Sequence, residues 1–271
     1  MADVKISALP SASSAAGTDI VPADQSGTTR GVTASQLGTY VAANFPGLLN
    51  VQVLTSTSAN STYTPTTGTS SFLAECVGGG GGGGNGLNTA ANNRADGGGG
   101  GGGAYAAYFN NAVAASYSYS CGTGGGINTN ASGSAGGNTI FGNASNNCAY
   151  ANAGGGGGGG FNNTGGAGGG SAAGGTSGTP NTGTIKIPGG NGEPGFHGGN
   201  NAAINDICEG GMGGAAGRGY GQGGTGATFS IQAAGNGGNY GGGGGGSASN
   251  NSTNAGGKTG AQGVIIVWEY Q

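Results

Sequence analysis

Apolar residues gather in three short runs, and their pattern predicts β-strands. Residues 49–54 partly alternate between apolar and polar side chains, 72–77 form a second apolar run, and 264–270 form the strongest one. In the last run, the odd-numbered residues from Ile265 onward should face one side and the even-numbered residues the other. We expect the three runs to pair in one sheet, which would bring the two ends of the intervening chain together.

The start of the chain predicts a small module of its own. Residues 20–32 read as a hairpin that turns at Ser26-Gly27, because a two-residue turn containing glycine separates two strand-like stretches. Thr33 and Gln36 then have the spacing of a capping box, in which the threonine caps a helix and the glutamine bonds back to it. Apolar residues at helical spacing follow, so a short helix is expected there.

Four blocks of glycine interrupt the rest of the chain, at residues 78–84, 97–103, 154–160 and 241–246. An α-helix is excluded there, because each glycine costs about 1 kcal/mol relative to alanine. Collagen needs a Gly-X-Y repeat and abundant proline, whereas here glycine comes in blocks and the chain has 7 prolines, so collagen is rejected. Two readings remain: mobile linkers, or extended helices of three residues per turn that hydrogen-bond sideways. The Tyr, Phe and Ile residues between the blocks favour packed helices.

Glycine dominates the composition, with 74 of 271 residues. Charged residues make up only 6 % and the net charge is −3, so the chain lacks the high charge that keeps disordered proteins expanded. Large apolar residues are also scarce, so backbone hydrogen bonds must supply much of the stability. The predicted fold class is all-β: a small N-terminal module, residues 1–46, and a glycine-rich β domain, residues 47–271, with packed extended segments of the polyglycine II type.

The charge pattern argues against two classes of partner. Six Lys and Arg residues are spread along the chain without a basic stripe, so we expect no nucleic-acid binding. No apolar run approaches the length of a membrane span, so we expect no membrane insertion. The N-terminus lacks a hydrophobic signal segment, which favours synthesis and retention in the cytoplasm until the protein is released.

Residue types that carry catalysis or bind metals are few. His197 is the single histidine and lies in a stretch that reads as a loop, so a catalytic triad is not supported. Nothing fixes the distance between Glu193 and Glu209, and no helix follows the glycine blocks as a phosphate loop requires. Asp206, Cys208 and Glu209 are a weak metal set. We expect no enzyme activity, no cofactor and no metal.

The four cysteines contain no CxxC pair: Cys76, Cys121, Cys148 and Cys208. Without a signal segment, reduced and buried thiols are the first reading. Disulfides formed after release and a metal site remain as alternatives.

Residues 4–41 resemble the N-terminal segment of many bacteriophage fibre and tail proteins. There a Lys-Ile-Ser-x-Leu-Pro opening precedes an aspartate, a Val-Pro pair and a short helix capped by threonine. The matching residues here are Lys5 to Pro10, Asp19, Val21-Pro22 and Thr33. The resemblance implies that residues 1–46 attach the protein to virion proteins of the tail or capsid. The residues that it assigns to this contact are Ile6, Leu9, Pro10, Val21 and Pro22.

Residues 48–271 resemble the glycine-rich domain of phage tail fibres. That domain opens with a threonine-rich strand, runs through a valine into a glycine block, and closes with a hydrophobic strand and an acidic-aromatic tail. The matching landmarks are Tyr63-Thr64-Pro65, Glu75 to Gly84, Gly136 to Gly142 and Gly263 to Tyr270. The resemblance implies a structural virion protein, a short tail fibre or head fibre, that forms a homotrimer and binds a host cell-surface receptor.

Two other functions remain open at this point. The absence of a long shaft leaves room for a capsid or head decoration fibre without an essential receptor. A non-viral structural or ice-binding protein is the third reading, although ice binding would favour a strict short repeat with a flat face, and no such period is evident in the sequence.

Loops rich in Asn and Tyr are the candidates for receptor binding, because antibody loops use the same mixture of residues. Recognition usually resides on loops that a rigid scaffold presents. The aromatic residues of these loops have core filling as their alternative reading. The candidate residues are Asn146, Asn147, Tyr150, Asn162, Asn163, Tyr240, Asn250 and Asn251.

Overall fold

The structure is a computed structural model, and it describes residues 20–25, 28–44, 47–85, 94–128, 131–142, 151–153, 161–162, 185–197, 208–228, 233–250 and 253–271. The fold is all-β, as the sequence predicts, with antiparallel sheets and one α-helix among the described residues. The chain divides into two compact units, Met1–Leu48 with Tyr270–Gln271, and Leu49–Glu269. A domain boundary after residue 46 stays a prediction.

The first unit contains a hairpin and a helix. Strand β1 (Ile20–Gln25) pairs antiparallel with β2 (Thr28–Thr33), and α1 spans Ala34–Asn44. The N–H of Thr33 donates to Gln36 Oε1 at 2.9 Å, and the N–H of Gln36 donates to Thr33 Oγ1 at 3.1 Å. These reciprocal bonds satisfy two backbone donors at the start of the helix. The predicted hairpin and capping box are therefore confirmed.

A five-stranded sheet with the order β12-β7-β5-β17-β3 organises the second unit. Its strands are β3 (Leu48–Leu54), β5 (Ser71–Val77), β7 (Tyr105–Asn110), β12 (Ile185–Ile187) and β17 (Val264–Tyr270). The three apolar runs thus pair in one sheet, as predicted. Along β17, residues 265, 267 and 269 are buried and residues 266, 268 and 270 are partly exposed, so the predicted alternation is confirmed.

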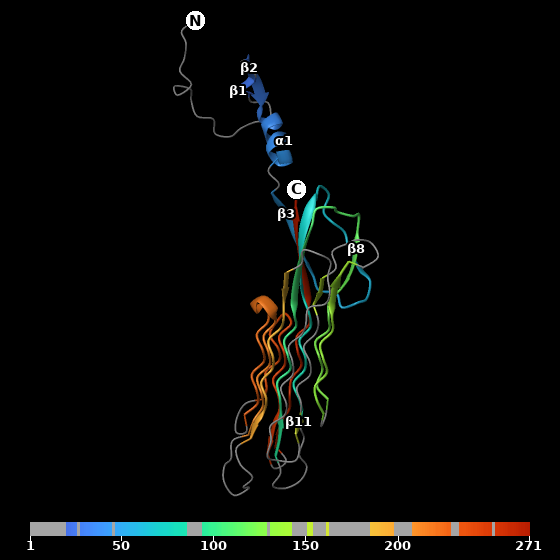
Figure 1. Cartoon of the computed structure of the whole chain (residues 1–271), viewed down its shortest axis with the longest axis vertical. Helices are drawn as coiled ribbons and strands as arrows, with labels where there is room; N and C mark the ends of the chain where they lie inside the picture. Colours follow the sequence, from blue (N-terminus) through green and yellow to red (C-terminus); the bar gives the residue numbers. More distant parts are fainter. Residues whose placement is uncertain are drawn as a thin grey trace, which may run out of the picture. The chain divides into compact units, whose positions relative to one another are not determined.

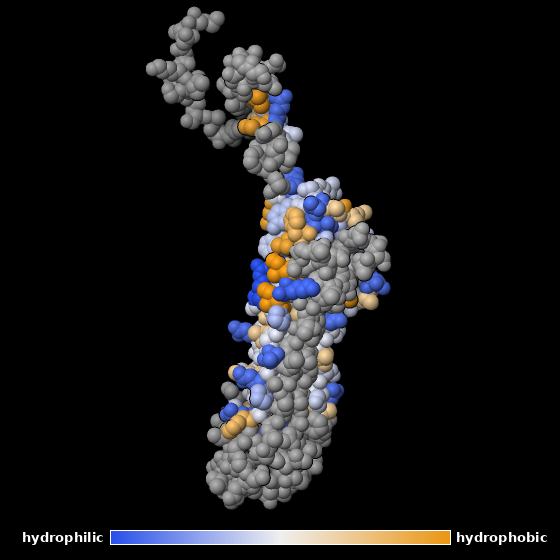
Figure 2. Space-filling view, in the orientation of Figure 1, coloured by the Kyte–Doolittle hydropathy of each residue, from blue (hydrophilic) through white to orange (hydrophobic). Residues whose placement is uncertain are grey.

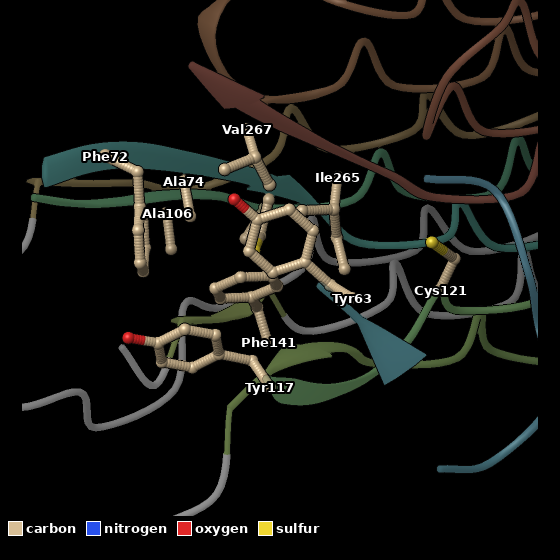
Figure 3. Close-up of a cluster of buried hydrophobic side chains, with 11 residues drawn as sticks. Tyr63, Phe72, Ala74, Ala106, Tyr117, Cys121, Phe141, Ile265 and Val267 are labelled. Atoms are coloured by element: carbon tan, nitrogen blue, oxygen red, sulfur yellow. The ribbon is translucent and has the colours of Figure 1, made fainter. Parts of the chain in front are cut away.

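A four-stranded sheet with the order β10-β9-β8-β4 covers one face of this sheet. Its strands are β4 (Ser61–Tyr63), β8 (Tyr117–Ser120), β9 (Thr139–Phe141) and β10 (Ala151–Ala153). An aromatic core fills the space between the two sheets (Figure 3). The rings of Phe72 and Tyr117 meet edge to face with centroids 5.1 Å apart. Each buried ring contributes about 1.5–3 kcal/mol through its burial.

Extended glycine segments run side by side from the five-stranded sheet and form a bundle (Figure 1). Blocks 78–84, 97–103 and 241–246 are buried within it, which confirms the predicted packing for these three. Block 154–160 lies outside the described residues. We call the end of the bundle that joins β5, β7 and β17 the sheet end, and the opposite end the far end.

Hydrogen bonds within the bundle follow a period of three residues. Along 78–85, the N–H groups at positions 78, 81 and 84 donate to carbonyl groups of 98–104. Those at positions 79, 82 and 85 donate to 131–137, and those at positions 80 and 83 donate to 258–261. A helix with three residues per turn and no internal hydrogen bonds points successive N–H groups in three directions. One segment therefore binds three neighbours through its donors alone, and its backbone groups are satisfied although they are buried.

The segment at the centre of the bundle shows why glycine is needed. Hydrogen bonds join 241–247 to six others: 78–84, 97–103, 211–214, 224–227, 235–238 and 258–262. A Cβ on Gly100 would lie 2.2 Å from the carbonyl oxygen of Gly81, and one on Gly244 would lie 1.9 Å from that of Lys258. No side chain fits between segments at this spacing, so close backbone approach depends on glycine.

Outer segments of the bundle carry larger residues at every third position. Met212, Ala215 and Arg218 follow one such spacing, Gln222 and Thr225 another, and all five are exposed. The residues between them are glycine or alanine, apart from Tyr220, and most face neighbouring segments. Residues that face neighbouring segments must therefore be small, whereas residues at the exposed third positions can be larger.

Two small sheets close the far end. One has the order β11-β6-β15-β16, with β6 (Arg94–Gly97), β11 (Phe161–Asn162), β15 (Ala248–Asn250) and β16 (Thr253–Ala255). The other pairs β13 (Phe196–His197) with β14 (Cys208–Glu209). At the sheet end, the short 3-10 turn η3 (Gly217–Gly219) reverses the chain.

Candidate functional site

The far end is where the chain repeatedly leaves the described bundle. Described stretches begin or end there at residues 85, 94, 128, 131, 162, 197, 208, 228, 233, 250 and 253. The segments that connect these points fall outside the described residues. By contrast, the chain enters this unit through β3 and leaves it through β17, both in the five-stranded sheet. Many connections between bundle segments therefore lie at the far end, opposite the five-stranded sheet through which the chain enters and leaves the unit. Recognition usually resides on such connections when a rigid scaffold presents them.

Two predicted recognition residues lie at this end, on strands that flank β6. Asn162 in β11 is the register partner of Asp96, and Asn250 in β15 is the partner of Arg94. Because neighbouring strands are about 4.8 Å apart, β11 and β15 are separated by about 10 Å. The fold therefore brings together two asparagines that are far apart in the sequence.

The other predicted recognition residues are not grouped there. Tyr240 lies at the sheet end and packs, partly buried, against the cluster that contains Val77 and Tyr105. Strands β9 and β10, which bound the segment 142–150, pair through Phe141 and Ala151 in the sheet region. Five of the predicted residues lie outside the described residues: Asn146, Asn147, Tyr150, Asn163 and Asn251.

The residues assigned to virion attachment are described only in part. Val21 and Pro22 lie in β1, where their register partners in β2 are Val32 and Gly31. The others lie outside the described residues: Ile6, Leu9 and Pro10.

Strand β13 adds an aromatic residue that sequence reasoning did not single out for binding. Phe196 is 59 % exposed and pairs with Glu209 of β14. His197, which composition placed in a loop, lies in the same strand opposite Cys208. A strand of two residues leaves no periodic signal, so the sequence pattern could not locate it.

A buried carboxylate lies under the sheet end of the bundle. The Tyr105 hydroxyl donates to Glu75 Oε1 at 2.6 Å and the Trp268 indole donates to Glu75 Oε2 at 2.7 Å, while the Arg218 guanidinium forms an ion pair with the same group. Burial, followed by the hydrogen bond to Glu75, raises the pKa of Tyr105 well above its usual range. Burial also raises the pKa of Tyr220, which stacks on Tyr105, to about 12.

This arrangement is structural in character. Glu75 is only 5 % exposed, and both of its carboxylate oxygens are engaged by protein donors. A general base needs a lone pair directed at a substrate, and these bonds leave Glu75 poorly placed for that role. The network instead fixes η3 to the sheet.

A second carboxylate, Glu269, is fully buried near the end of β17. Its Oε1 accepts hydrogen bonds from the Tyr63 hydroxyl at 2.5 Å, the Gln52 amide at 3.0 Å and the N–H of Thr66 at 3.0 Å. Burial acts to raise the pKa of Glu269, but the hydrogen bonds from Thr66, Tyr63 and Gln52 outweigh it and lower that pKa below its usual value. Glu269 is therefore held as a carboxylate that ties β17 to β3 and β4.

The described thiols are poor nucleophiles. Cys76 and Cys121 are free and buried in the aromatic core. Burial raises the pKa of Cys121 to about 11 and raises that of Cys76 as well, so the reactive thiolate is rare in both. Cys208 lies in β14, and Cys148 falls outside the described residues.

Two features are absent from the described residues. These residues contain no group of three His, Cys, Asp or Glu side chains arranged to hold a metal ion. No helix among them has the length and apolar character needed to cross a membrane.

The fold defines an all-β protein whose backbone packing depends on glycine. The model of the protein family described as Glycine-rich domain matches residues 55–270, and the chain belongs to this family. The match begins directly after β3 and ends at the last residue of β17, so it covers the second sheet, the bundle and the closing strand. No curated protein matches the chain.

Proposed function

We propose that this protein is a structural appendage of a bacteriophage virion, a short tail fibre or head fibre, that binds the surface of the host cell. The proposal rests on the resemblance of residues 4–41 and 48–271 to phage fibre proteins. The observation that carries it is the bundle itself, because its segments, which lead to the far-end connections, are hydrogen-bonded to their neighbours along their length.

In this fold, the residues proposed for recognition are separate from the hydrogen bonds that stabilise the bundle. Each bundle segment is held by hydrogen bonds along its length, and glycine fills its inner face. Sequence changes at the far end therefore leave these bonds intact. Such an arrangement suits a binding protein, because loops on a rigid scaffold can change without loss of the fold.

The residue types of the candidate surface fit polar ligands. Asn162 and Asn250 lie on strands about 10 Å apart, and asparagine is a residue type that can both donate and accept hydrogen bonds. Phe196 adds an exposed ring in β13. Amides with an aromatic face are suited to sugars, which offer hydroxyl groups along one edge and C–H groups on one face.

The N-terminal unit supplies the second half of the proposal. Residues 1–46 attach the protein to other virion proteins, with Ile6, Leu9, Pro10, Val21 and Pro22 at the contact. The protein is made in the host cytoplasm and resides on the virion. It needs no cofactor and catalyses no reaction.

Adsorption of purified, full-length protein to host cells tests the binding role. Replacing Asn162 and Asn250 by alanine should reduce adsorption at least tenfold, because both lie at the far end. Replacing Asn111 by alanine provides the control, since this exposed asparagine directly follows β7 in the sheet region. Equal loss in both variants would contradict a binding surface at the far end.

A decoration fibre is the second candidate function, because the resemblance leaves open where on the virion such a fibre sits. Immuno-electron microscopy of intact particles separates the two. Label on the capsid, together with normal host adsorption by particles that lack the protein, would replace the receptor-binding role with decoration.

A further inference from the structure

One face of the five-stranded sheet is covered only in part. The second sheet covers the opposite face, where Phe72 and Ile265 are fully buried. On the partly covered face, Ala216 and Tyr240 pack over the part of the sheet next to the bundle, where Val77 and Val264 are buried. The part of this face away from the bundle has no such cover among the described residues.

Four large apolar side chains are exposed on this uncovered part. Val51 is 37 % exposed, Val53 57 %, Phe109 56 % and Ile185 60 %. Partly exposed apolar residues on the same face connect them: Leu73, Ile187, Ile266 and Trp268. In unit 2, the most hydrophobic surface in Figure 2 gathers largely over the sheet-bearing half.

Strand register places these residues on one face. Phe109 is paired with Leu73, and Ile185 is paired with Ala107, which lies in the same cluster as Val77. Directly paired residues point to the same side of a sheet, and residues two apart on one strand do so too. Strand β3 forms the other edge of the sheet, next to β17. Its Gln52 and Leu54 face the aromatic core, so Val51 and Val53 face outward.

This apolar face is electrically neutral. The five strands carry three charged residues, and two of them, Lys186 and Glu269, are on the opposite face. The third is Glu75, whose charge is balanced by Arg218. The face therefore offers nothing to an anionic or cationic partner, and a copy of itself meets no like-charge repulsion.

The edge of the sheet beside Val53 is also unprotected. Strand β3 is the last in the order, spans seven residues and contains neither a charged residue nor a proline. Natural proteins normally guard such an edge with charge, proline or a covering element. An edge that lacks these devices and adjoins an apolar face is expected to be covered by another chain.

The size of the face suits a subunit contact. Five strands spaced about 4.8 Å apart and up to about 20 Å long give the whole sheet face a footprint of roughly 400 Å², of which the part next to the bundle is already covered. A stable interface buries about 800 Å² on each partner, so the uncovered part supplies its apolar centre and the surrounding polar surface supplies its rim. A face of this size is costly to leave in water but sufficient as the centre of an interface.

We propose that this face, formed by the outward residues of β3, β5, β7, β12 and β17, packs against the same sheet region of a second copy of this chain. Contact between copies buries the exposed valines and phenylalanine together and covers the edge of β3. Two copies satisfy the contact directly, and three satisfy it around a threefold axis. The contact does not depend on host-cell binding, so it can be tested apart from the proposed function.

Light scattering coupled to gel filtration of the full-length protein tests the contact. We expect a mass of two or three chains. The double variant Val53→Lys with Phe109→Lys should elute at the mass of one chain, because both lysines would be buried without partners in the interface. Its thermal unfolding should keep the cooperativity of the parent, since both positions are exposed in the single chain.

Two matched controls replace exposed apolar residues that lie outside the sheet face. Ile127 is 42 % exposed and Met212 49 % exposed, both on the bundle. Ile127→Lys and Met212→Lys should keep the mass of the parent protein. A parent that elutes as one chain, or a double variant that retains the mass of its parent, would overturn the proposal.

The single tryptophan gives a readout that needs no substitution. Trp268 is partly exposed on the proposed face, so its fluorescence reports water at the interface. Dilution of the parent protein through its dissociation range should shift the emission to longer wavelength at the concentration where the mass falls. Dissociation without any shift of the emission would place the contact elsewhere and overturn the proposal.

Discussion

The indole of Trp268 donates a hydrogen bond of 2.7 Å to Glu75, a residue 193 positions earlier in the chain. The bond joins β17 to its neighbour in the sheet, β5, and these are the strands that directly precede and follow the glycine bundle in the sequence. Arg218 and Tyr105 bind the same carboxylate from the bundle side. Glu75 thus connects both strands to η3, and its removal should affect all of them.

Replacing Glu75 by leucine should lower the free energy of unfolding by about 2–4 kcal/mol. The substitution leaves the Tyr105 hydroxyl and the Trp268 indole without their acceptor, and unsatisfied buried donors are costly. Glu193→Leu is the matched control, because the Glu193 side chain is exposed, and it should change stability by less than about 0.5 kcal/mol. Urea titrations of both variants measure the difference. Equal midpoints would refute a stabilising role for Glu75.

Gly100→Ala should prevent the bundle from packing, although it adds a single methyl group. The new Cβ would lie 2.2 Å from the carbonyl oxygen of Gly81, and its nearest neighbours are all backbone atoms of Gly81 and Gly82, which cannot move aside as a flexible side chain can. Gly126→Ala is the control, because nothing lies within 4 Å of the corresponding Cβ. We expect the first variant to be insoluble or to lose at least about 3 kcal/mol, and the second to melt with the parent. Parent-like amide exchange along 97–103 in Gly100→Ala would contradict the packing.

Much of this architecture could be predicted from the sequence because its signals are local or strongly apolar. The capping box of Thr33 and Gln36 needs only a spacing of three residues, and the apolar runs identify β5 and β17 directly. Packing of the glycine blocks is predicted from the Tyr, Phe and Ile residues that lie between them, which pure linkers seldom contain. These features do not depend on distant contacts.

Other features could not be predicted because their cause lies in distant contacts. Strands β4, β9 and β10 have three residues each, too few to show alternation. The spacing of three residues on the outer segments cannot be recognised in the sequence, because glycine also occupies many of the outward positions. Tyr240 resembles a loop residue beside a glycine block, but it packs against the cluster containing Val77 because the adjacent turn lies at the sheet end.

High pH should unfold the protein before its buried tyrosines ionise. Burial, with the nearby carboxylates, raises the pKa values of Tyr63 and Tyr105 far above 10.0, and burial raises that of Tyr220 to about 12. Unfolded tyrosines ionise near 10.0, so the stability from these groups is complete below that pH and declines as the pH rises beyond it. Tyrosinate absorbance and circular dichroism should show a fraction of the ten tyrosines ionising only with unfolding. Ionisation of all ten near pH 10 in folded protein would refute this.

Acid should weaken the closing strand through Glu269. Its folded-state pKa lies below the ordinary value of 4.5, because hydrogen bonds from Thr66, Tyr63 and Gln52 favour the carboxylate despite its burial. Proton binding is linked to folding, so the stability that Glu269 contributes is complete above about pH 4.5 and is lost as the pH falls through the lower, folded-state pKa. Glu269→Gln removes this titration, so the variant should be less stable at pH 7 by about 1–3 kcal/mol.

The difference between the parent protein and Glu269→Gln should therefore shrink as the pH falls from 5 to 3. Urea midpoints of both proteins across this range measure it, and Glu193→Gln serves as the control because its carboxylate is exposed. The control should follow the parent at every pH. A gap between Glu269→Gln and the parent that stays constant down to pH 3 would show that the carboxylate of Glu269 does not couple proton binding to folding.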